Sequence, residues 1–399
     1  MLQDLPKTRI PTFSKVCDAY DWFDPALDRV IREALRVEPF TNRRQWEFAM
    51  IYLALHEADA LRPDARGLGL GVGAERLIFA LAERVAEIRA TDLYEPGSRW
   101  VGVRTDDPQA LVAAKAPPFA RNGILDRIRA ERADMRDLSY PSDSFDFAWS
   151  TGAFEHIGED ADFLAHLNEV DRVLKPGGVY AFTTVLSYER ETSRIPHNHY
   201  FHPEHFLDLL HASRLRPDPV YDVRIARNHL NRPMIETLRP YGLGGVERHL
   251  HPVTSWRRGI VTVANVTFLR KGDGGPKTRP KVQGLKKTQG WLQRVAHAAN
   301  DAFWSEWTPL ALEAEGRPMT SWHFFGSGPV ELEIEAPSPG EATLRVRGRI
   351  TPGEARTERR LDFGRGRSLH RFEADAEATY AIALKDGAVE APRLRARRV

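Results

Sequence analysis

The sequence predicts an α/β fold: a doubly wound, Rossmann-like sheet, with a helical N-terminal segment before it and a separate antiparallel β-sandwich after it. Three observations carry this prediction. Glycines occupy every second position in GLGLGVG, residues 67–73, directly before a helix-like run. Strand-like and helix-like segments then alternate as far as about residue 271, as they do in βαβ units. From about residue 290, apolar and polar residues alternate with period two, which is typical of half-buried antiparallel strands.

These patterns divide the chain into four parts. Residues 1–62 contain two helix-like runs, FDPALDRVIREALRV and NRRQWEFAMIYLALHEADAL, and we interpret them as a lid or acceptor-binding segment. Residues 63–271 form the α/β domain, with strands expected in RGLGLGV, EIRATDL, DSFDFAWST and VYAFTTVL. Residues 272–289 are rich in Gly, Pro and Lys and are expected to be a basic linker. Residues 290–399 form the β-sandwich.

Composition argues against several classes of protein. Lys and Arg number 57 against 55 Asp and Glu, so no global charge attracts nucleic acid or an anionic membrane. The single cysteine, Cys17, leaves no disulfide framework and fits a reducing compartment. No run approaches the roughly 18 apolar residues of a membrane span, and the N-terminus lacks the apolar core of a signal peptide. We therefore expect a cytoplasmic protein with no membrane span, and the sequence shows no strong sign of a nucleic-acid partner.

The glycine loop predicts a nucleotide-binding site. In doubly wound folds, ligands bind beyond the carboxyl ends of the strands, and glycines allow the backbone to approach them closely. Asp92 ends the second expected strand, 19 residues beyond Gly73, where an acid can bind ribose hydroxyls. Glycines alone do not identify the cofactor, because Gly69, Gly71 and Ala74 also satisfy the GxGxxA variant used for NAD.

Residues farther along the chain distinguish between these cofactors. The stretch ADMRDLSYPSDSFDFAWSTGAFEHI, the helix that ends in LKPGG at Leu174–Gly178, and the opening FHPEHFLDLLHASRLRP follow the glycine loop in order. With these motifs, residues 60–271 resemble the class I S-adenosylmethionine-dependent methyltransferases, in particular type 11-like ones. The resemblance implies S-adenosylmethionine as cofactor and S-adenosylhomocysteine as product.

The same resemblance implies a set of cofactor-binding residues. Asp134 would accept a hydrogen bond from the adenine amino group, and Met135 would lie against the ring. The full set is Gly69, Gly71, Gly73, Glu75, Asp92, Leu93, Asp134, Met135 and Ser150. One position departs from the family's pattern, because the acid that usually precedes the glycines falls on Gly67. Its contact with the methionine amino group would then come from Glu75 or from residues 43–47.

Three histidines are candidates for the catalytic base. Removing a proton from a hydroxyl acceptor calls for a group that titrates near neutral pH, and histidine is the usual one. His156 follows the fourth expected strand, whereas His197 and His199 lie in the loop after the fifth. The alternative for each histidine is a purely structural side chain, either packed in the interior or solvated at the surface. Glu155 and His156 match two positions of a metal site in some methyltransferases, but Gly152 replaces the third acid, so we predict no metal.

The acceptor is predicted from weaker signals. The opening RQWEFA with GLGLGVG resembles methyltransferases associated with cell-surface polysaccharide assembly, so the leading interpretation is O-methylation of a sugar or polysaccharide precursor. The alternatives are O- or N-methylation of a small molecule and a non-catalytic binding or scaffold protein. The C-terminal aromatic residues would form either a sugar-stacking platform or a buried seal; they are Trp304, Trp307, Trp322, Phe324 and Phe325. The C-terminal domain is also a candidate surface for oligomerisation.

Overall fold

The computed structural model describes most of the chain: residues 5–98, 100–120, 123–195, 197–235, 252–255, 259–312, 319–351, 353, 355, 357–385 and 392–399. The chain divides into two compact units. The first unit comprises Met1–Leu186, Pro196–Arg227 and Val263–Leu285, and the second comprises Ser187–Ile195, Asn228–Thr262 and Lys286–Val399.

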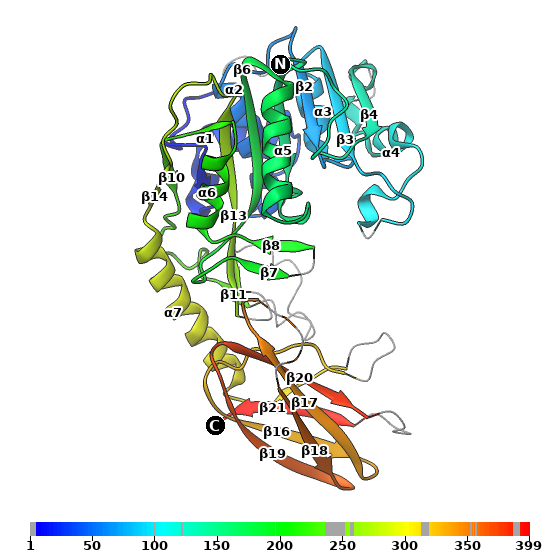
Figure 1. The fold of residues 1–399 in the computed structure, drawn as a ribbon, viewed down its shortest axis with the longest axis vertical. Coiled ribbons are helices and arrows are strands. Elements are labelled where there is room, and N and C mark those ends of the chain that lie inside the picture. The colour runs from blue at the N-terminus through cyan, green and yellow to red at the C-terminus, as the bar shows by residue number, and fades with distance from the viewer. Residues whose placement is uncertain are drawn as a thin grey trace. The chain divides into compact units, whose positions relative to one another are not determined.

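A mixed sheet forms the centre of the first unit, and nine of its strands follow one another in the order β14-β10-β1-β13-β6-β5-β2-β3-β4 (Figure 1). Adjacent strands are parallel throughout the part of the sheet with the order β6-β5-β2-β3-β4. Strand β1, in contrast, runs antiparallel to its neighbour β13. The bounds are β1 Lys15–Val16, β2 Arg66–Leu70, β3 Glu87–Asp92, β4 Ile128–Arg132, β5 Phe145–Thr151, β6 Leu174–Ser187, β10 Val220–Asp222, β13 Val261–Arg270 and β14 Lys281–Gln283. The predicted Rossmann-like α/β class is therefore confirmed.

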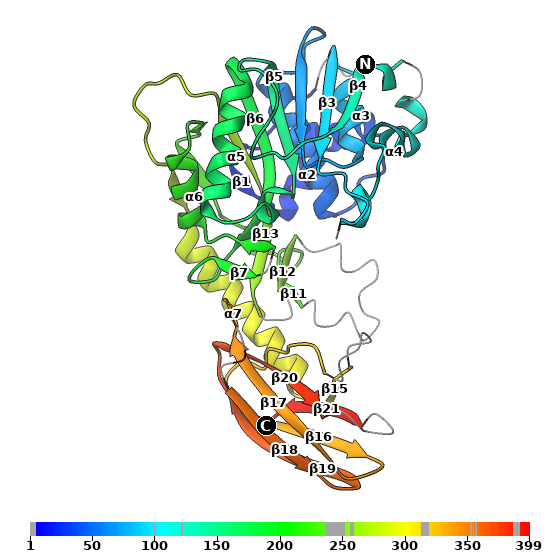
Figure 2. The same cartoon turned by 45° about the vertical axis from the view of Figure 1, so that its right-hand side comes forward.

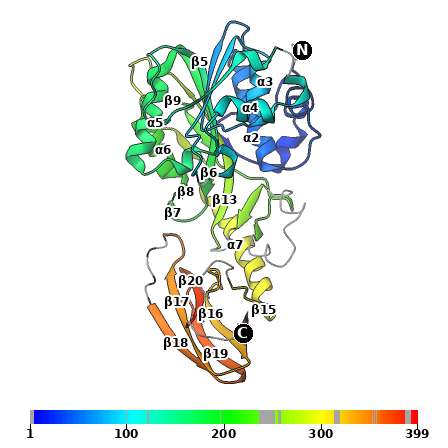
Figure 3. The ribbon, with the colours of Figure 1, turned by 90° about the vertical axis from the view of Figure 1, so that its right-hand side faces the viewer.

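Helices cover both faces of this sheet. Figure 3 shows α5 and α6 on one side and α2 and α3 on the other, in agreement with the contacts within each pair. The helices of the first unit are α1 Pro25–Arg29, α2 Arg43–Glu57, α3 Arg76–Ala82, α4 Pro108–Lys115, α5 Asp160–Val173 and α6 Pro203–Ala212. Because α3 follows β2 and α4 follows β3, the segments between them meet at the carboxyl edge of the sheet, where ligands of such folds bind.

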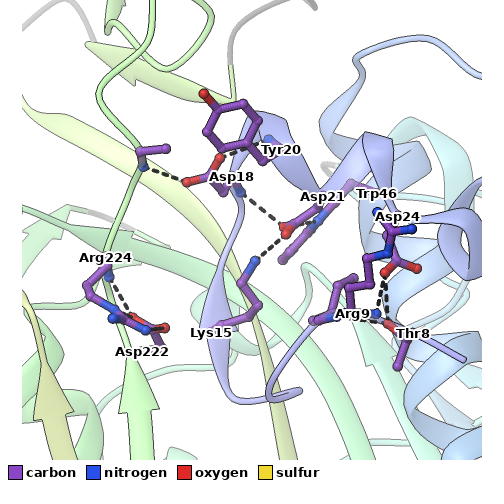
Figure 4. A network of polar contacts seen from close by, with 12 residues as sticks. Thr8, Arg9, Lys15, Asp18, Tyr20, Asp21, Asp24, Trp46, Asp222 and Arg224 are labelled. Carbon is purple, nitrogen blue, oxygen red and sulfur yellow. Dashed lines mark hydrogen bonds and ion pairs between the residues drawn. The ribbon is translucent and has the colours of Figure 1, made fainter.

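The N-terminal segment is joined to the sheet and to α2 by buried polar contacts (Figure 4). Lys15 forms an ion pair with Asp21, whose Oδ2 also accepts a hydrogen bond of 2.8 Å from Trp46 Nε1 in α2. Asp18 accepts from the backbone N–H of Ala226 at 2.6 Å. Strand β1 pairs with both β10 and β13. These contacts hold α2 against the sheet, so that the first turns of α2 are fixed beside the carboxyl edge.

We expect Lys15→Met to lower the free energy of unfolding by about 3–5 kcal/mol, because it leaves the buried Asp21 carboxylate without its cation. Urea unfolding followed by circular dichroism measures the change. Arg29→Ala is the matched control: it breaks an exposed ion pair with Glu33, which is worth at most about 1 kcal/mol. Equal effects of the two substitutions would contradict a stabilising role for the buried network.

Residues 272–289, expected to be a linker, contain regular structure. Strand β14 adds to the sheet beside β10, and helix α7 (Leu285–Trp304) begins directly after Gly284. Every fourth residue of α7 is buried; these residues are Thr288, Leu292, Ala296, Asn300 and Trp304. Such a stripe is a helical signal, but the Gly, Pro and Lys content upstream obscures it.

Two basic side chains of residues 272–289, Lys277 and Arg279, bind other residues of the first unit. Lys277 Nζ donates to the backbone oxygens of Leu210 and Ser213 at the end of α6, at 2.6 and 2.9 Å. Burial lowers the pKa of Lys277 to about 8. Arg279 forms ion pairs with Glu204 and Asp208. These two side chains are therefore occupied within the first unit, as expected for cations near helix carbonyls and acids.

Two antiparallel sheets form the β-domain of the second unit, which confirms the predicted antiparallel domain (Figure 2). One sheet has the order β15-β21-β16-β19 and the other β18-β17-β20. Their bounds are β15 Thr308–Pro309, β16 Gly328–Ala336, β17 Gly340–Gly348, β18 Thr357–Phe363, β19 Gly366–Ala374, β20 Ala378–Leu384 and β21 Arg393–Arg398. Short strands of this unit are β7 Ser193–Ile195, β11 Met234–Ile235 and β12 Val253–Ser255.

The C-terminal aromatic residues differ in exposure. Trp304 and Phe325 belong to the core of the sandwich, where their ring centroids lie 4.6 Å apart. Phe324 is also buried. The half-buried rings are covered by cations: Arg347 lies over Trp322 at 3.8 Å, and two arginines lie over Trp307. The five rings therefore do not form an exposed stacking platform.

Candidate active site

A pocket of about 670 Å³ opens at the carboxyl edge of β2, β3 and β5 in the first unit. Its wall combines the glycine loop, the ends of these strands, the start of α2 and the segment before α4. The residues on it are Arg44, Phe48, Gly71, Val72, Gly73, Ala74, Glu75, Asp92, Leu93, Trp100, Gly102, Val103, Lys115, Ala133, Asp134, Met135, Arg136, Thr151, Gly152, Ala153, His156 and Ile157. A volume of this size is typical of small-molecule and cofactor sites.

The glycine loop forms the floor of the pocket in a conformation that needs glycine. Gly71 and Gly73 have φ of +65° and +50°, a region that other residues rarely adopt. A Cβ on Gly71 would also lie 2.7 Å from Met135 Cε. Gly69 has a different function, because it is off the pocket wall and a Cβ there would lie 2.6 Å from the Trp149 ring. Of the three predicted glycines, two reach the pocket and the third allows the sheet to pack.

Asp92 lies at the end of β3 and binds the glycine loop. Its Oδ2 accepts a hydrogen bond of 2.9 Å from Gly73 N–H, and its Oδ1 accepts one of 2.7 Å from Leu93 N–H. Burial raises the pKa of Asp92, and these two backbone donors oppose the shift. Leu93 is itself on the pocket wall. The structure therefore brings Asp92, Leu93 and Gly73 together, as the motif predicts.

The segment after β4 supplies the opposite wall. Asp134 and Met135 both line the pocket, and Arg136 forms an ion pair of 2.7 Å with Asp134. The hydrogen bonds from Arg136 hold the pKa of Asp134 below its usual value, so Asp134 is an anionic acceptor at neutral pH. Ser150, also predicted to bind the cofactor, is fully buried in β5 and lies off the pocket wall; the adjacent Thr151 lines the pocket.

Gly67 cannot be an acid in this fold, whereas Glu75 enters the pocket. A Cβ on Gly67 would lie 2.3 Å from Phe147 Cζ and 2.9 Å from Ile88 Cδ1. Glu75 stands at the N-cap position of α3, and its Oε1 accepts hydrogen bonds from Trp149 Nε1 at 2.9 Å and Thr151 Oγ1 at 3.1 Å. The carboxylate missing from β2 is therefore matched by one a few residues later in the chain.

A buried ion network attaches α2 to the pocket. Arg43 Nε lies 2.7 Å from Glu47 Oε1, and its Nη2 lies 3.8 Å from Glu155 Oε1. Glu155 also accepts a hydrogen bond of 2.7 Å from Thr184 Oγ1. Glu155 thus faces Arg43 and Thr184, and the predicted alternative in which it binds a metal beside His156 gains no support from its contacts. Within the described ranges, no three His, Cys, Asp or Glu residues form a metal-binding group.

His156 is the predicted base that lies on the pocket wall. Its Nδ1 is 2.9 Å from the backbone oxygen of His197. A carbonyl oxygen only accepts hydrogen bonds, so Nδ1 carries the proton and Nε2 of the neutral ring has a free lone pair. No hydrogen bond reaches Nε2 from any residue that the structure describes. The Trp100 ring packs against the imidazole at a centroid distance of 4.5 Å.

The other two predicted histidines lie off the pocket wall. His197 is exposed and has φ of +63°, a strained conformation for a residue with a Cβ; its contribution to His156 comes from its backbone oxygen. His199 is only 3% exposed. It packs edge-on against Phe163 and stacks with Phe201, and its Nε2 lies 3.5 Å from Glu159. Of the three candidates, His156 lines the pocket, His197 contributes only a backbone hydrogen bond to His156, and the side chain of His199 is packed in the interior.

Sequence reasoning missed several residues of the pocket, and Trp100 and Lys115 are the largest side chains among those outside the motifs. Trp100 is 46% exposed and lies beside His156, and Lys115 ends α4 at the rim. Neither belongs to a motif. The signal for Trp100 would have been a large aromatic residue in a polar loop directly after the strand that ends in Asp92.

Comparison with known proteins identifies the domain. Residues 68–182 match the family model described as a methyltransferase domain. Residues 68–182 form a methyltransferase domain. The predicted class I S-adenosylmethionine-dependent methyltransferase is thereby confirmed for this domain, and S-adenosylmethionine is the cofactor of the methyltransferase domain.

A curated relative is malonyl-[acyl-carrier protein] O-methyltransferase of Salmonella typhimurium, 32% identical over 139 residues, which are 33% of this chain. The chain spans about half, 46%, of that relative. Among solved structures, the methyltransferase domain is similar to a putative sarcosine dimethylglycine methyltransferase from Galdieria sulphuraria, with 19% identity, coverage of 57% of this chain and 85% of the other, and a TM-score of 0.39. A geranyl diphosphate C-methyltransferase from Streptomyces coelicolor has 17% identity, coverage of 55% and 77%, and a TM-score of 0.38.

Among the helices of the described residues, none combines the length and the apolar character that crossing a bilayer requires.

Proposed function

We propose that the protein transfers a methyl group from S-adenosylmethionine to a hydroxyl of a sugar or polysaccharide precursor. One observation supports the O-methylation reading most strongly. The His197 backbone oxygen holds the proton of His156 on Nδ1, which leaves Nε2 on the pocket wall to accept a proton from the acceptor.

The pocket fits the proposed cofactor. Gly71 and Gly73 keep the loop free of side chains, so a ligand can lie against the backbone there. Asp92 lines the pocket, and we infer that it accepts hydrogen bonds from ribose hydroxyls beside the backbone N–H groups of Gly73 and Leu93 that its carboxylate already binds. Asp134 and Met135 line the same pocket, and we infer that they bind the adenine, the first through its carboxylate and the second through its side chain. Leu93, which follows Asp92, also lines this pocket.

In the proposed reaction, the protein itself positions the acceptor and provides the base that removes a proton from it. S-adenosylmethionine supplies an electrophilic methyl group on a sulfonium, which reacts without further activation. The protein must hold the acceptor in line and remove its proton. His156 Nε2 takes that proton, and the His197 carbonyl stabilises the resulting imidazolium through Nδ1–H. Trp100 holds the ring plane from one side.

Two features support a sugar acceptor. The exposed indole of Trp100 lies next to the proposed base, where its face can pack against the C–H face of a sugar ring. Lys115 on the same wall is suited to phosphate or carboxylate groups, which sugar precursors carry. The second candidate is O- or N-methylation of a small apolar molecule, favoured by Phe48, Val103 and Ile157 on the wall. Cytoplasmic location and association through the β-sandwich stay predictions.

The test is methyl transfer from labelled S-adenosylmethionine into fractionated extract of the source organism. We expect label in the saccharide or lipid-linked saccharide pool, and none with Asp92→Ala. Label only in small molecules would favour the second candidate. No label in any pool from a folded protein would overturn both and favour a non-catalytic binding protein.

A further inference from the structure

The pocket wall after β4 is a tight turn with a buried backbone oxygen at its centre. Asp137 N–H donates a hydrogen bond of 3.1 Å to the backbone oxygen of Asp134, which closes the turn. Met135 lies between them and packs its side chain against the glycine loop, since a Cβ on Gly71 would lie 2.7 Å from its Cε. The buried backbone oxygen of Met135 needs a donor from another part of the chain.

The donor is His166 of helix α5. Its Nδ1 lies 3.0 Å from the backbone oxygen of Met135, and its Nε2 lies 2.9 Å from the hydroxyl of Tyr180 in β6. A carbonyl oxygen only accepts hydrogen bonds, so Nδ1 carries the proton and Nε2 accepts from the Tyr180 O–H. His166 is fully buried, and this burial lowers its pKa to about 4. The ring is therefore neutral at pH 7, with a partner for each nitrogen.

One peptide unit connects His166 with the carboxylate of Asp134. The peptide between Met135 and Arg136 receives the hydrogen bond from His166 on its oxygen, and its N–H donates a hydrogen bond of 2.9 Å to Asp134 Oδ1. Because a trans peptide is planar and its two polar groups point in opposite directions, fixing the oxygen also fixes the N–H. Asp134 lines the pocket, whereas His166 does not. A side chain behind the wall thus orients a carboxylate on it.

We propose that His166 is a positioning residue that sets the preference of the pocket for adenine, because it orients through this peptide the carboxylate that receives the adenine amino group. This inference rests on the proposed function, since it takes S-adenosylmethionine or its product as the ligand. The His166 ring contacts neither cofactor nor acceptor. Its proton stays on Nδ1, and no covalent bond forms or breaks.

Two amide variants separate the two contacts of the ring. The amide nitrogen of asparagine takes the place of Nδ1, so His166→Asn keeps a donor for Met135. The longer glutamine reaches the place of Nε2, so His166→Gln keeps an acceptor for Tyr180 and loses the donor. Calorimetry measures the affinities for S-adenosylhomocysteine and for S-inosylhomocysteine, in which an oxygen replaces the adenine amino group. The ratio of these affinities reports how well Asp134 is oriented.

We expect the wild-type protein to prefer S-adenosylhomocysteine by about tenfold or more, the contribution of one hydrogen bond to a charged group. His166→Asn should keep most of this preference, whereas His166→Gln should lower it to about twofold or less. Tyr180→Phe is the matched control, because it removes the other partner of the same buried ring. It should lower Tm and leave the preference unchanged.

The outcomes separate this proposal from the proposed function. Failure of the wild-type protein to bind S-adenosylhomocysteine would overturn the function and the positioning by His166 together. Binding without preference for the amino group would overturn the positioning alone. A full preference in His166→Gln, or an equal loss in Tyr180→Phe, would do the same.

If His166→Gln fails to fold, NMR spectra of the wild-type protein with ¹⁵N-labelled histidine decide. The Nδ1 signal of His166 is identified by its loss in His166→Asn. S-adenosylhomocysteine should shift this signal, because the base binds at the far side of the same peptide. S-ribosylhomocysteine, which lacks the base, should leave it in place. Equal shifts with both ligands, or none with either, would overturn the positioning.

Discussion

Replacing His156 with alanine is expected to lower the rate of methyl transfer by about 10²–10⁴-fold, the usual contribution of a positioned general base. Affinity for S-adenosylhomocysteine should stay within about twofold of the wild-type value, because the proposed cofactor contacts lie on the glycine loop, β3 and the segment after β4. The rate is measured as label incorporated into the active fraction of the extract, and the affinity by calorimetry.

The control for His156→Ala is His211→Ala. His211 is exposed in the last turn of α6 and is not on the pocket wall, so its removal should leave the rate unchanged. A His156→Ala protein that keeps more than a tenth of the wild-type rate would contradict the assignment of His156 as the base. A parallel loss of cofactor affinity would point instead to a structural contribution of the ring.

Asp92→Ala is expected to weaken S-adenosylhomocysteine binding about a hundredfold or more. The substitution removes the acceptor that holds Gly73 N–H and Leu93 N–H, and with it the proposed contact to the ribose. Hydrogen bonds to a charged group contribute about 1.5–3 kcal/mol each, and two such losses account for the expected change. Calorimetry or the ligand-induced rise in Tm measures it.

Two further variants serve as controls for the loss of affinity expected from Asp92→Ala. Asp92→Asn keeps the shape of the side chain and should give a smaller loss than Asp92→Ala, since one amide oxygen still accepts. Asp126→Ala removes an exposed acid outside the pocket and should change nothing. A loss below threefold for Asp92→Ala would mean that the end of β3 is not the ribose site.

Local patterns in the sequence predicted the sheet, its helices and the floor of the pocket. The glycine loop and Asp92 follow from the backbone itself: strand β2 must turn into α3 with φ above zero at Gly71 and Gly73, and β3 must end beside that turn. Such constraints act over a few residues, so a single sequence displays them. The same holds for the β-domain, where alternation along β16 and β17 reports which side chains enter the core.

Contacts between distant segments were not predictable in the same way. His197 and His199 are two residues apart, yet one gives its backbone oxygen to His156 and the other packs against Phe163. The sequence shows only that both are histidines in a loop. Trp100 approaches His156 because the segment before α4 folds over the pocket, and no motif encodes that path. Glu155 faces Arg43 in α2, which is more than a hundred residues earlier.

The departure at Gly67 was visible in the sequence, but its reason was not. Phe147 and Ile88 fill the space beside Gly67 from the two strands that flank β2, so an acid there would be overpacked and buried without a partner. Glu75 avoids this cost because it lines the pocket, with Trp149 and Thr151 as donors to its carboxylate. The proposed replacement of an acid at position 67 by Glu75 becomes apparent only when both positions are seen in the structure.

The most direct test of the central claim is a calorimetric titration of the wild-type protein with S-adenosylhomocysteine and, separately, with NAD. Both ligands carry an adenosine group that suits a glycine loop followed by an acid at the end of the second strand, but the match of residues 68–182 to a methyltransferase domain favours the first. We expect one S-adenosylhomocysteine to bind per chain and NAD not to bind. Binding of NAD in its place, or of neither ligand, would contradict the assignment of this pocket to methyl transfer.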